Sequence, residues 1–207
     1  MIDKLYVVGL TGPTGSGKSV VSRVLADNNI PVIDTDILAR KVVEPGTECL
    51  QELAEKFSDE ILNDDCTLNR RELAKRAFST PENCRLLNSI THPHIIKLTK
   101  SILMKMEQMH ESVAVIDAPL LFESGMDLMC DMTVAVVASY DKRLKRILVR
   151  DSGLDEELAR ARMASQQSED YYISRASVVL NSNGQLDVLR EQAEKLAQNI
   201  RDWSHEK

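Results

Sequence analysis

One stretch restricts the fold of this chain more than any other: residues Gly12–Ser19, which read G-P-T-G-S-G-K-S. They match the pattern G-x-x-x-x-G-K-[ST] of a phosphate-binding loop, which needs a strand before it and a helix after it. Residues 5–10 are short, apolar and rich in valine, as in a buried strand, and residues 19–26 carry apolar side chains at helical spacing. The context that the motif needs is present, so an accidental glycine-rich turn explains the pattern poorly.

The chemistry of such a loop follows from its glycines, which let the backbone curl until several N–H groups point at one anion. The helix that begins there adds the positive end of its dipole. In this pattern Lys18 reaches the β- and γ-phosphates, and the hydroxyl of Ser19 binds Mg²⁺. We therefore predict that the chain binds a nucleoside triphosphate with Mg²⁺. The residues expected to contact the nucleotide are Gly12, Gly15, Ser16, Gly17, Lys18, Ser19 and Val20.

Length and composition limit the remaining possibilities. A chain of 207 residues suits one domain with an inserted helical subdomain, and 43% apolar residues suffice for a core. The net charge of −6 argues against general affinity for nucleic acid. The four scattered cysteines, without a C-x-x-C pair, indicate free thiols in a reducing compartment. With neither a signal segment nor a membrane-spanning run, we expect a cytoplasmic protein that binds no membrane and no nucleic acid.

Two further predicted strands, residues 30–34 and 113–117, each end in an aspartate. The carboxyl ends of strands are where open α/β sheets bind ligands. Asp36 follows Asp34 closely and can cap the helix expected over residues 37–43, and the residues alone do not decide which aspartate caps and which has a function. Asp117 stands where a Walker B aspartate holds Mg²⁺ directly or through water.

The region from Glu44 to His110 is predicted to be helical throughout. Thr80-Pro81 is a good helix start, and His92-Pro93 is expected to end that helix, with a further helix beyond it. The region is longer than a connection between two strands requires. We interpret it as an inserted lobe that binds the phosphoryl acceptor, with a purely structural helical pair as the competing interpretation.

Arginine residues recur along the next helical segment, after a fourth predicted strand at residues 132–137. Arg143, Arg146 and Arg150 lie three and four residues apart, where like charges repel one another. A solvated face is the simple explanation, but an anionic ligand would relieve the repulsion, and guanidinium groups suit phosphate geometry. Together with a second helix, the segment about 141–167 is predicted to be a mobile lid over the triphosphate. A fifth strand at 176–181 and a final helix at 186–203 complete the chain.

Four stretches together resemble one family, the dephospho-coenzyme A kinases. They are Gly12–Ser19, Asp34–Arg40 followed by Glu44-Pro45-Gly46, Asp117–Glu123, and Arg146-x-x-x-Arg150 leading to Arg162-x-x-x-Gln166. Their order and spacing cover almost the whole chain. The resemblance implies a three-layer α/β P-loop NTPase fold with a five-stranded parallel sheet, a helical acceptor-binding insertion at about 44–110 and an arginine-rich lid, all within one domain over residues 1–207.

The resemblance also implies an activity and a set of residues. Members transfer the γ-phosphoryl group of ATP to the ribose 3′-hydroxyl of dephospho-coenzyme A, the last step of coenzyme A synthesis. It assigns Asp36 as the group that takes the proton of the hydroxyl. The implied catalytic residues are Asp36, Lys18, Arg146 and Arg150; Arg146 also binds ATP; Asp34, Asp36, Arg40, His92 and Leu120 bind the acceptor; Ser19 and Asp117 bind the metal. We expect a monomer or a weak homo-oligomer.

The sequence departs from the family's usual loop at Pro13, Thr14 and Val20, where Gly, Ile and Thr are common. Gly-Pro-Thr at this position also resembles prenyl-transferring tRNA-modification enzymes, although the acidic, short chain argues against RNA binding. Another small-molecule kinase, acting on a nucleoside or a nucleotide, is the main alternative. A nucleotide-dependent switch is a third, but the N-K-x-D motif of guanine-specific switches is absent from the sequence.

Overall fold

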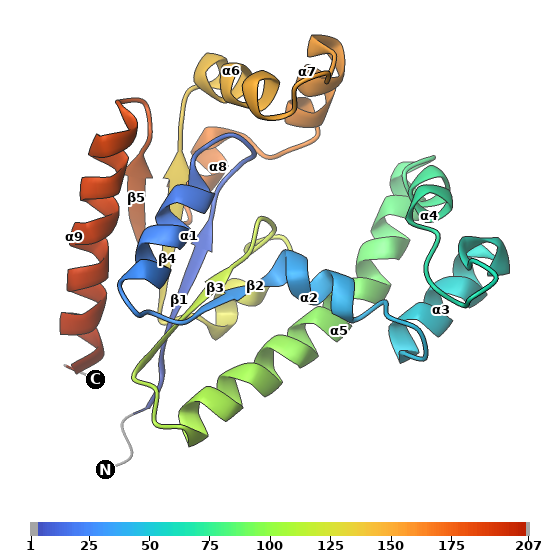
Figure 1. The fold of residues 1–207 in the computed structure, drawn as a ribbon, viewed down its shortest axis with the longest axis horizontal. Coiled ribbons are helices and arrows are strands. Elements are labelled where there is room, and N and C mark those ends of the chain that lie inside the picture. The colour runs from blue at the N-terminus through green and yellow to red at the C-terminus, as the bar shows by residue number, and fades with distance from the viewer. Residues whose placement is uncertain (1–3, 206–207) are drawn as a thin grey trace. The chain divides into compact units, whose positions relative to one another are not determined.

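The structure is a computed structural model that describes residues 4–205. The chain forms two compact units (Figure 1). One comprises Met1–Ile33 together with Lys105–Lys207, and the other comprises Asp34–Met104. No helix within the described residues combines the length and the apolarity that crossing a bilayer requires.

The first unit is built on a five-stranded sheet with the order β2-β3-β1-β4-β5. Its strands are β1 (Tyr6–Thr11), β2 (Val32–Asp34), β3 (Val113–Asp117), β4 (Met132–Val137) and β5 (Val178–Asn181). Strand β1 pairs in parallel with β3 and β4, and β4 pairs in parallel with β5. All residues of β3 and β4 are buried, which explains why their sequences are apolar without alternation. The predicted parallel sheet is confirmed, although β2 and β5 each begin two residues later than expected.

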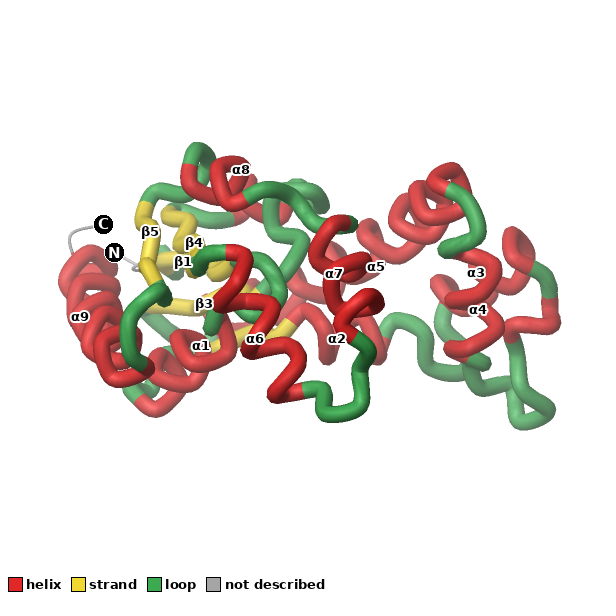
Figure 2. The backbone as a smooth tube through the Cα atoms, turned by 90° about the horizontal axis from the view of Figure 1, so that it is seen from above, coloured by secondary structure: helices red, strands yellow, loops and turns green. Residues whose placement is uncertain are grey.

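Helices cover both faces of this sheet, which makes the three layers that the fold class predicts (Figure 2). On one face, α1 (Lys18–Asp27) and α9 (Leu186–His205) pack on the strands through a core that includes Val21, Leu25 and Ile200. On the other face, the short helix α8 (Glu169–Ile173) places the buried ring of Tyr172 against β4. The short 3₁₀ helix η2 (Met126–Met129) packs near β1.

The predicted lid is a pair of helices, α6 (Tyr140–Arg150) and α7 (Glu156–Ala164). They share a small apolar cluster of their own, formed by Leu144, Ile147, Ala159 and Met163. The apolar stripe of α6 therefore packs against α7, as the helical spacing of Leu144 and Ile147 predicted, and the arginines form a separate stripe on the same helix.

The second unit is helical. Its elements are α2 (Thr35–Lys41), α3 (Glu48–Phe57), the 3₁₀ helix η1 (Asp59–Ile61), α4 (Arg70–Ala77) and α5 (Pro81–Gln108), whose last residues belong to the first unit. Side-chain caps begin several of these helices. Thr47 accepts from the N–H of Leu50 at α3, and Asn69 accepts from that of Glu72 at α4. Thr80 accepts from the N–H of Asn83 at the start of α5, as Thr80-Pro81 predicted.

Two expectations about this unit are wrong. The region is not helical throughout, because residues 62–69 form a loop closed by an antiparallel bridge between Leu62 and Leu68. Asp65 explains part of this, since its carboxylate accepts from the N–H of Thr67 at 3.0 Å, and such local side-chain bonds compete with a helix. Cys66 adds a positive φ of 62°, which a helix cannot contain.

Pro93 does not end a helix either, since α5 runs for 28 residues with Pro93 inside it. A proline removes one backbone hydrogen bond and costs a helix about 3 kcal/mol or more. Burial on both sides offsets this cost, because Ile90 lies one turn before the proline and Ile95 shortly after it, and both are buried. The rule that a helix stops before proline gives way here to tertiary packing.

Candidate active site

The phosphate-binding loop connects the end of β1 to the start of α1 and has the backbone that its glycines predict. Gly12, Gly15 and Gly17 have φ values of 147°, 77° and 102°. A Cβ atom on Gly12 would lie 2.3 Å from the carbonyl oxygen of Val136, and one on Gly15 would lie 2.8 Å from that of Arg143. Conformation and close packing therefore both require glycine, and the loop fits tightly against β4 and α6.

Two arginines of α6 hold the outer side of this loop. Arg143 Nε donates to the carbonyl oxygen of Thr14 at 2.9 Å, and one nitrogen of Arg146 donates to those of Gly15 and Ser16 at 3.2 Å each. In a trans peptide the N–H points opposite to the C=O. The N–H groups of Gly15 and Gly17 are therefore turned away from α6.

Ser16 adds a polar side chain to the loop. The backbone N–H of Ser16 donates to the carbonyl oxygen of Pro13 at 3.1 Å, which closes the turn. The side-chain hydroxyl oxygen of Ser16 is buried and has no hydrogen-bond partner among the described residues. A buried hydroxyl without a partner is costly, so an acceptor such as a phosphate oxygen would stabilise it.

Lys18 and Asp117 form an ion pair at the mouth of the loop. Strand pairing brings them together, because Asp117 lies opposite Leu10 in the register of β1 and β3, and Lys18 begins the helix that follows β1. Their side chains are only 16% and 8% exposed, so the pair is well shielded from water. Ser19 next to it is exposed.

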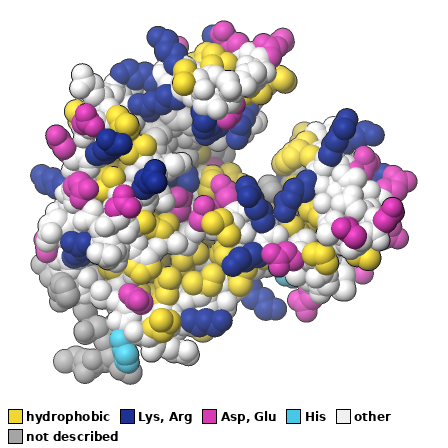
Figure 3. Space-filling model, in the orientation of Figure 1, with side chains coloured by type: hydrophobic (Ala, Val, Ile, Leu, Met, Phe, Trp, Pro, Cys, Tyr) yellow, Lys and Arg dark blue, Asp and Glu magenta, His cyan; other side chains and the backbone are white. Residues whose placement is uncertain are grey.

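Arg146 and Arg150, the two arginines predicted to act from the lid, have different surroundings. Besides the loop, Arg146 binds Ser182 after β5, donating to its hydroxyl at 2.9 Å and to its carbonyl oxygen at 2.6 Å. Arg150 binds both carboxylate oxygens of Asp151 at 2.9 Å, and this contact raises the pKa of Arg150 and lowers that of Asp151. The structure thus brings Arg146 to the phosphate loop, whereas Arg150 makes a half-exposed ion pair. Basic side chains gather over α6 in Figure 3.

Three residues around the loop were absent from the predicted site: Arg143, Gln166 and Ser182. Arg143 belonged to the noted arginine stripe, and its position three residues before Arg146 was the available signal. Gln166 belonged to a motif of the family resemblance without a role, and here its side-chain oxygen accepts from the N–H of Thr14 at 3.0 Å. No pattern in the sequence distinguishes Ser182.

In the second unit, Asp34 and not Asp36 caps α2, which decides a choice that the sequence left open. The Asp34 carboxylate accepts from the N–H groups of Asp36 and Ile37, at 2.8 and 3.3 Å. The reason is one of register, because the helix begins at Thr35, two residues earlier than expected. Asp36 and Arg40 lie four residues apart on α2, hence on one face, and both are exposed.

The other two predicted acceptor residues belong to different units. His92 lies on α5 of the second unit, and burial lowers its pKa below the ordinary value. Leu120 follows β3 in the first unit and is 45% exposed.

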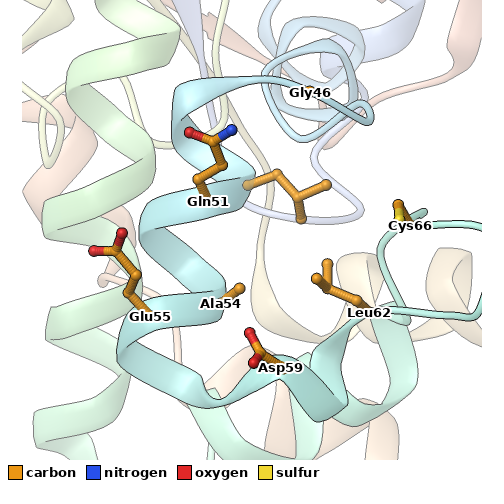
Figure 4. A pocket seen from close by; sticks show the side chains of 8 residues that line it. Gly46, Gln51, Ala54, Glu55, Asp59, Leu62 and Cys66 are labelled. Atoms are coloured by element: carbon orange, nitrogen blue, oxygen red, sulfur yellow. The ribbon is translucent and has the colours of Figure 1, made fainter.

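A hollow of about 370 Å³ lies within the second unit, between α3 and the loop after η1. Ala54 and Leu62 face each other across it, with Asp59 at one end and Gln51 and Glu55 on α3 (Figure 4). Leu50, Gly46 and Cys66 complete the lining. The carboxylates of Glu55 and Asp59 in its lining would repel a phosphate group, so this hollow does not extend the predicted nucleotide site.

Comparison with known proteins agrees with this geometry. The model of the dephospho-CoA kinase family matches residues 6–187. A dephospho-CoA kinase of Corynebacterium efficiens is 43% identical over 193 residues, covering 93% of this chain and 96% of that protein. The crystal structure of TT1252 from Thermus thermophilus superposes with a TM-score of 0.77 at 33% identity, covering 94% of this chain and 97% of that one. Dephospho-CoA kinase from Campylobacter jejuni shares the fold, with a TM-score of 0.64 at 21% identity over 95% and 98% of the two chains.

Proposed function

This chain belongs to the dephospho-CoA kinase family, and from that premise we propose that it transfers the γ-phosphoryl group of ATP to the ribose 3′-hydroxyl of dephospho-CoA. In this reaction the hydroxyl oxygen bonds to the γ-phosphorus, the bond to the β-γ bridging oxygen breaks, and ADP leaves. The observation that carries the proposal is the phosphate loop: its glycines are in the required conformation, its outer carbonyls are held by arginines, and its lysine lies at the mouth. The family match supports the identity of the acceptor.

On the donor side, the N–H groups turned away from α6 and the Ser16 hydroxyl would bind the phosphates of ATP. Lys18 would exchange Asp117 for oxygens of the β- and γ-phosphates and so stabilise the charge that develops during transfer. The ion pair of Lys18 with Asp117 keeps the lysine at the mouth of the loop until the nucleotide arrives.

Ser19 and Asp117 would hold Mg²⁺, since hydroxyl and carboxylate oxygens are the donors that this ion prefers. The fit is supported by the exposure of Ser19 and by the position of Asp117 at the carboxyl end of β3 beside Lys18. No cluster of three acidic, histidine or cysteine side chains suited to a metal occurs in residues 4–205, which is consistent with an ion bound chiefly through phosphates and water. Bound there, Mg²⁺ would neutralise charge on the β- and γ-phosphates.

On the acceptor side, Asp36 would accept a hydrogen bond from the 3′-hydroxyl and take its proton. The cap formed by Asp34 supports this choice between the two aspartates, because the Asp34 carboxylate is used by the helix N-terminus. A carboxylate of ordinary pKa is ionised at neutral pH, so no raised pKa is required. Arg40, on the same face of α2 as Asp36, would bind a phosphate of the acceptor, and Asp34, His92 and Leu120 are the further proposed contacts.

The lid would act through Arg146 and Arg150. Arg150 would leave Asp151 for the transferring phosphoryl group, while Arg146 already lies against the loop. Closure of such a lid excludes water that would otherwise hydrolyse ATP.

The decisive experiment compares acceptors. Dephospho-CoA, AMP and adenosine are supplied at equal concentration with ATP and Mg²⁺, ADP release is followed, and the new phosphate is located by NMR. We expect phosphate on the 3′-oxygen of dephospho-CoA and poor transfer to the two smaller molecules, because binding of the remote parts positions the hydroxyl. Equal transfer to AMP or adenosine would instead identify a general nucleotide or nucleoside kinase.

A further inference from the structure

Arg143 lies at the back of the phosphate loop and is buried there. Its side chain lies between the loop and α6 and the residue is only 5% exposed, yet its hydrogen-bond acceptors are neutral. Among residues 4–205 no carboxylate forms an ion pair with it, and Glu169 acts on it only through space. Burial lowers the pKa of Arg143, but a guanidinium group stays protonated in proteins. The loop is therefore backed by a buried positive charge.

The contacts of Arg143 form a closed ring with Thr14 and Gln166. Arg143 Nε donates to the carbonyl oxygen of Thr14 at 2.9 Å, and its NH2 nitrogen donates to Oε1 of Gln166 at 3.1 Å. The same oxygen accepts from the N–H of Thr14 at 3.0 Å. Two donors thus fix the orientation of the Gln166 amide, and both polar groups of the Thr14 backbone are held.

The amide at position 166 leaves the arginine charge uncompensated. A carboxylate there would accept the same two hydrogen bonds more strongly and would pair with the guanidinium group. If the ring served only to hold the loop, glutamate would serve at least as well. A buried cation without a partner carries a desolvation cost, and a polyanion bound on the other side of the loop recovers part of it.

We propose that Arg143 is a positioning residue for ATP: it orients the Thr14–Gly15 peptide and supplies positive charge behind the phosphate loop, and the neutral Gln166 keeps that charge available to the nucleotide. The inference rests on the proposed ATP site but not on the identity of the acceptor. Because nucleotide binding is measured without any acceptor, a failed acceptor assay and a failed Arg143 assay are distinguishable.

The principal test is the substitution Gln166→Glu, with Gln167→Glu as the matched control. Gln167 is the exposed neighbour, so its variant adds the same charge nearby without entering the ring. We expect Gln166→Glu to weaken ATP binding roughly tenfold or more, as a partly screened unit charge should. Titration calorimetry should show that Gln166→Glu loses less affinity for AMP than for ATP. Scanning calorimetry should show that its melting temperature is unchanged or raised. The control Gln167→Glu should bind ATP with near-normal affinity. Unchanged ATP affinity in a folded Gln166→Glu protein would overturn the proposal.

A second variant, Arg143→Met, keeps the test decisive if the first fails to fold. Methionine is similar in length and removes the desolvation cost of the buried cation, although the carbonyl oxygen of Thr14 loses the donor that Arg143 supplied. We expect a folded protein whose Kd for ATP rises by roughly tenfold or more, because both the charge and the hold on Thr14 are lost. The Kd for ATP of Arg143→Lys should lie between those of Arg143→Met and the wild type, because lysine keeps the charge but lacks the two-pronged guanidinium group. Binding of ATP by Arg143→Met within threefold of the wild type would contradict the proposal.

Discussion

The phosphate loop in the first unit and the segment Asp34–Arg40 in the second are organised in opposite ways. The loop is held by side chains distant in sequence, and its arginine contacts are largely shielded from water. The segment is capped locally by Asp34, and its Asp36 and Arg40 side chains are exposed. The difference indicates that the phosphate loop is arranged before a ligand binds, whereas the proposed acceptor side consists of groups on an exposed helix face.

The largest expected effect tests the preorganised side. Lys18→Ala should lower kcat by roughly 10³-fold, because a charge aimed at the transferring phosphoryl group is lost from a shielded site. Turnover of ATP is measured with dephospho-CoA present, and circular dichroism checks the fold. Lys145→Ala, an exposed lysine of α6, is the control. If Lys18→Ala kept more than a tenth of the wild-type turnover, the loop would not have the proposed role.

The acceptor side is tested next by Asp36→Asn. We expect kcat to fall by about 10²-fold, within the range of a general base, while the Kd for ATP stays unchanged. Asp34→Asn is the comparison variant: asparagine also caps a helix, and because Asp34 is a proposed acceptor contact, its loss should fall on the KM for dephospho-CoA more than on kcat. A larger rate loss in Asp34→Asn than in Asp36→Asn would reverse the assignment of the two aspartates.

Arg146 and Arg150 extend the comparison to the predicted lid. Arg146→Lys and Arg150→Lys should each lower kcat by about tenfold, because lysine keeps the charge but loses the bidentate fork. Only Arg146→Lys should also reduce the free energy of unfolding, by about 1 kcal/mol, since its guanidinium binds three backbone carbonyls and the Ser182 hydroxyl. Kinetics and urea unfolding measure the two effects separately. Normal kinetics in both variants would reduce the arginines to a structural role.

The cap of α2 gives a smaller effect, on stability alone. Asp34→Ala should cost about 0.5–2 kcal/mol in the free energy of unfolding, whereas Asp34→Asn should cost little. Asp36→Ala should leave the cap itself intact, because the cap hydrogen bonds are accepted by Asp34. Hydrogen exchange over residues 35–41 provides a local readout, and equal losses from the two alanine variants would show that the cap is shared.

The smallest effects concern pH and have opposite signs in the two units. Burial raises the pKa of Glu123 in the first unit and lowers that of His92 in the second. The folded protein therefore binds the Glu123 proton up to a higher pH than the unfolded chain does. The contribution of Glu123 to the free energy of unfolding is lost as pH rises above about 4.5, the ordinary pKa of a glutamate. On acidification the unfolded chain binds a proton at His92 at a higher pH than the folded protein does. The contribution of His92 to the free energy of unfolding is therefore lost as pH falls below about 6.5.

Melting temperatures between pH 4.5 and 8 test both signs. Glu123→Gln should flatten the decline that accompanies rising pH, and His92→Gln should flatten the decline that accompanies acidification. Each variant serves as the control of the other, and identical pH profiles for both variants and the wild type would contradict the two pKa directions.

Much of the fold was predictable from the sequence because its signals are local. The glycine pattern of residues 12–17 predicts a loop with positive φ angles between a strand and a helix, and the apolar runs of β3 and β4 predict buried strands. These predictions hold because backbone preference and burial pattern depend on neighbouring residues. The break expected at Pro93 failed for the complementary reason, since burial of Ile90 and Ile95 outweighs the local preference.

By itself, the sequence determined the family, the parallel sheet, the phosphate loop and the arginine stripe of α6. Only the tertiary structure decided which atoms those arginines bind. Gln166 meets Thr14 across 152 residues of chain, and Arg146 meets Ser182 across 36. No local pattern encodes such pairs, because a guanidinium group binds whichever carbonyl the folded chain brings within about 3 Å. The same holds for the cap of α2, which falls to Asp34 because the first turn of the helix begins at Thr35.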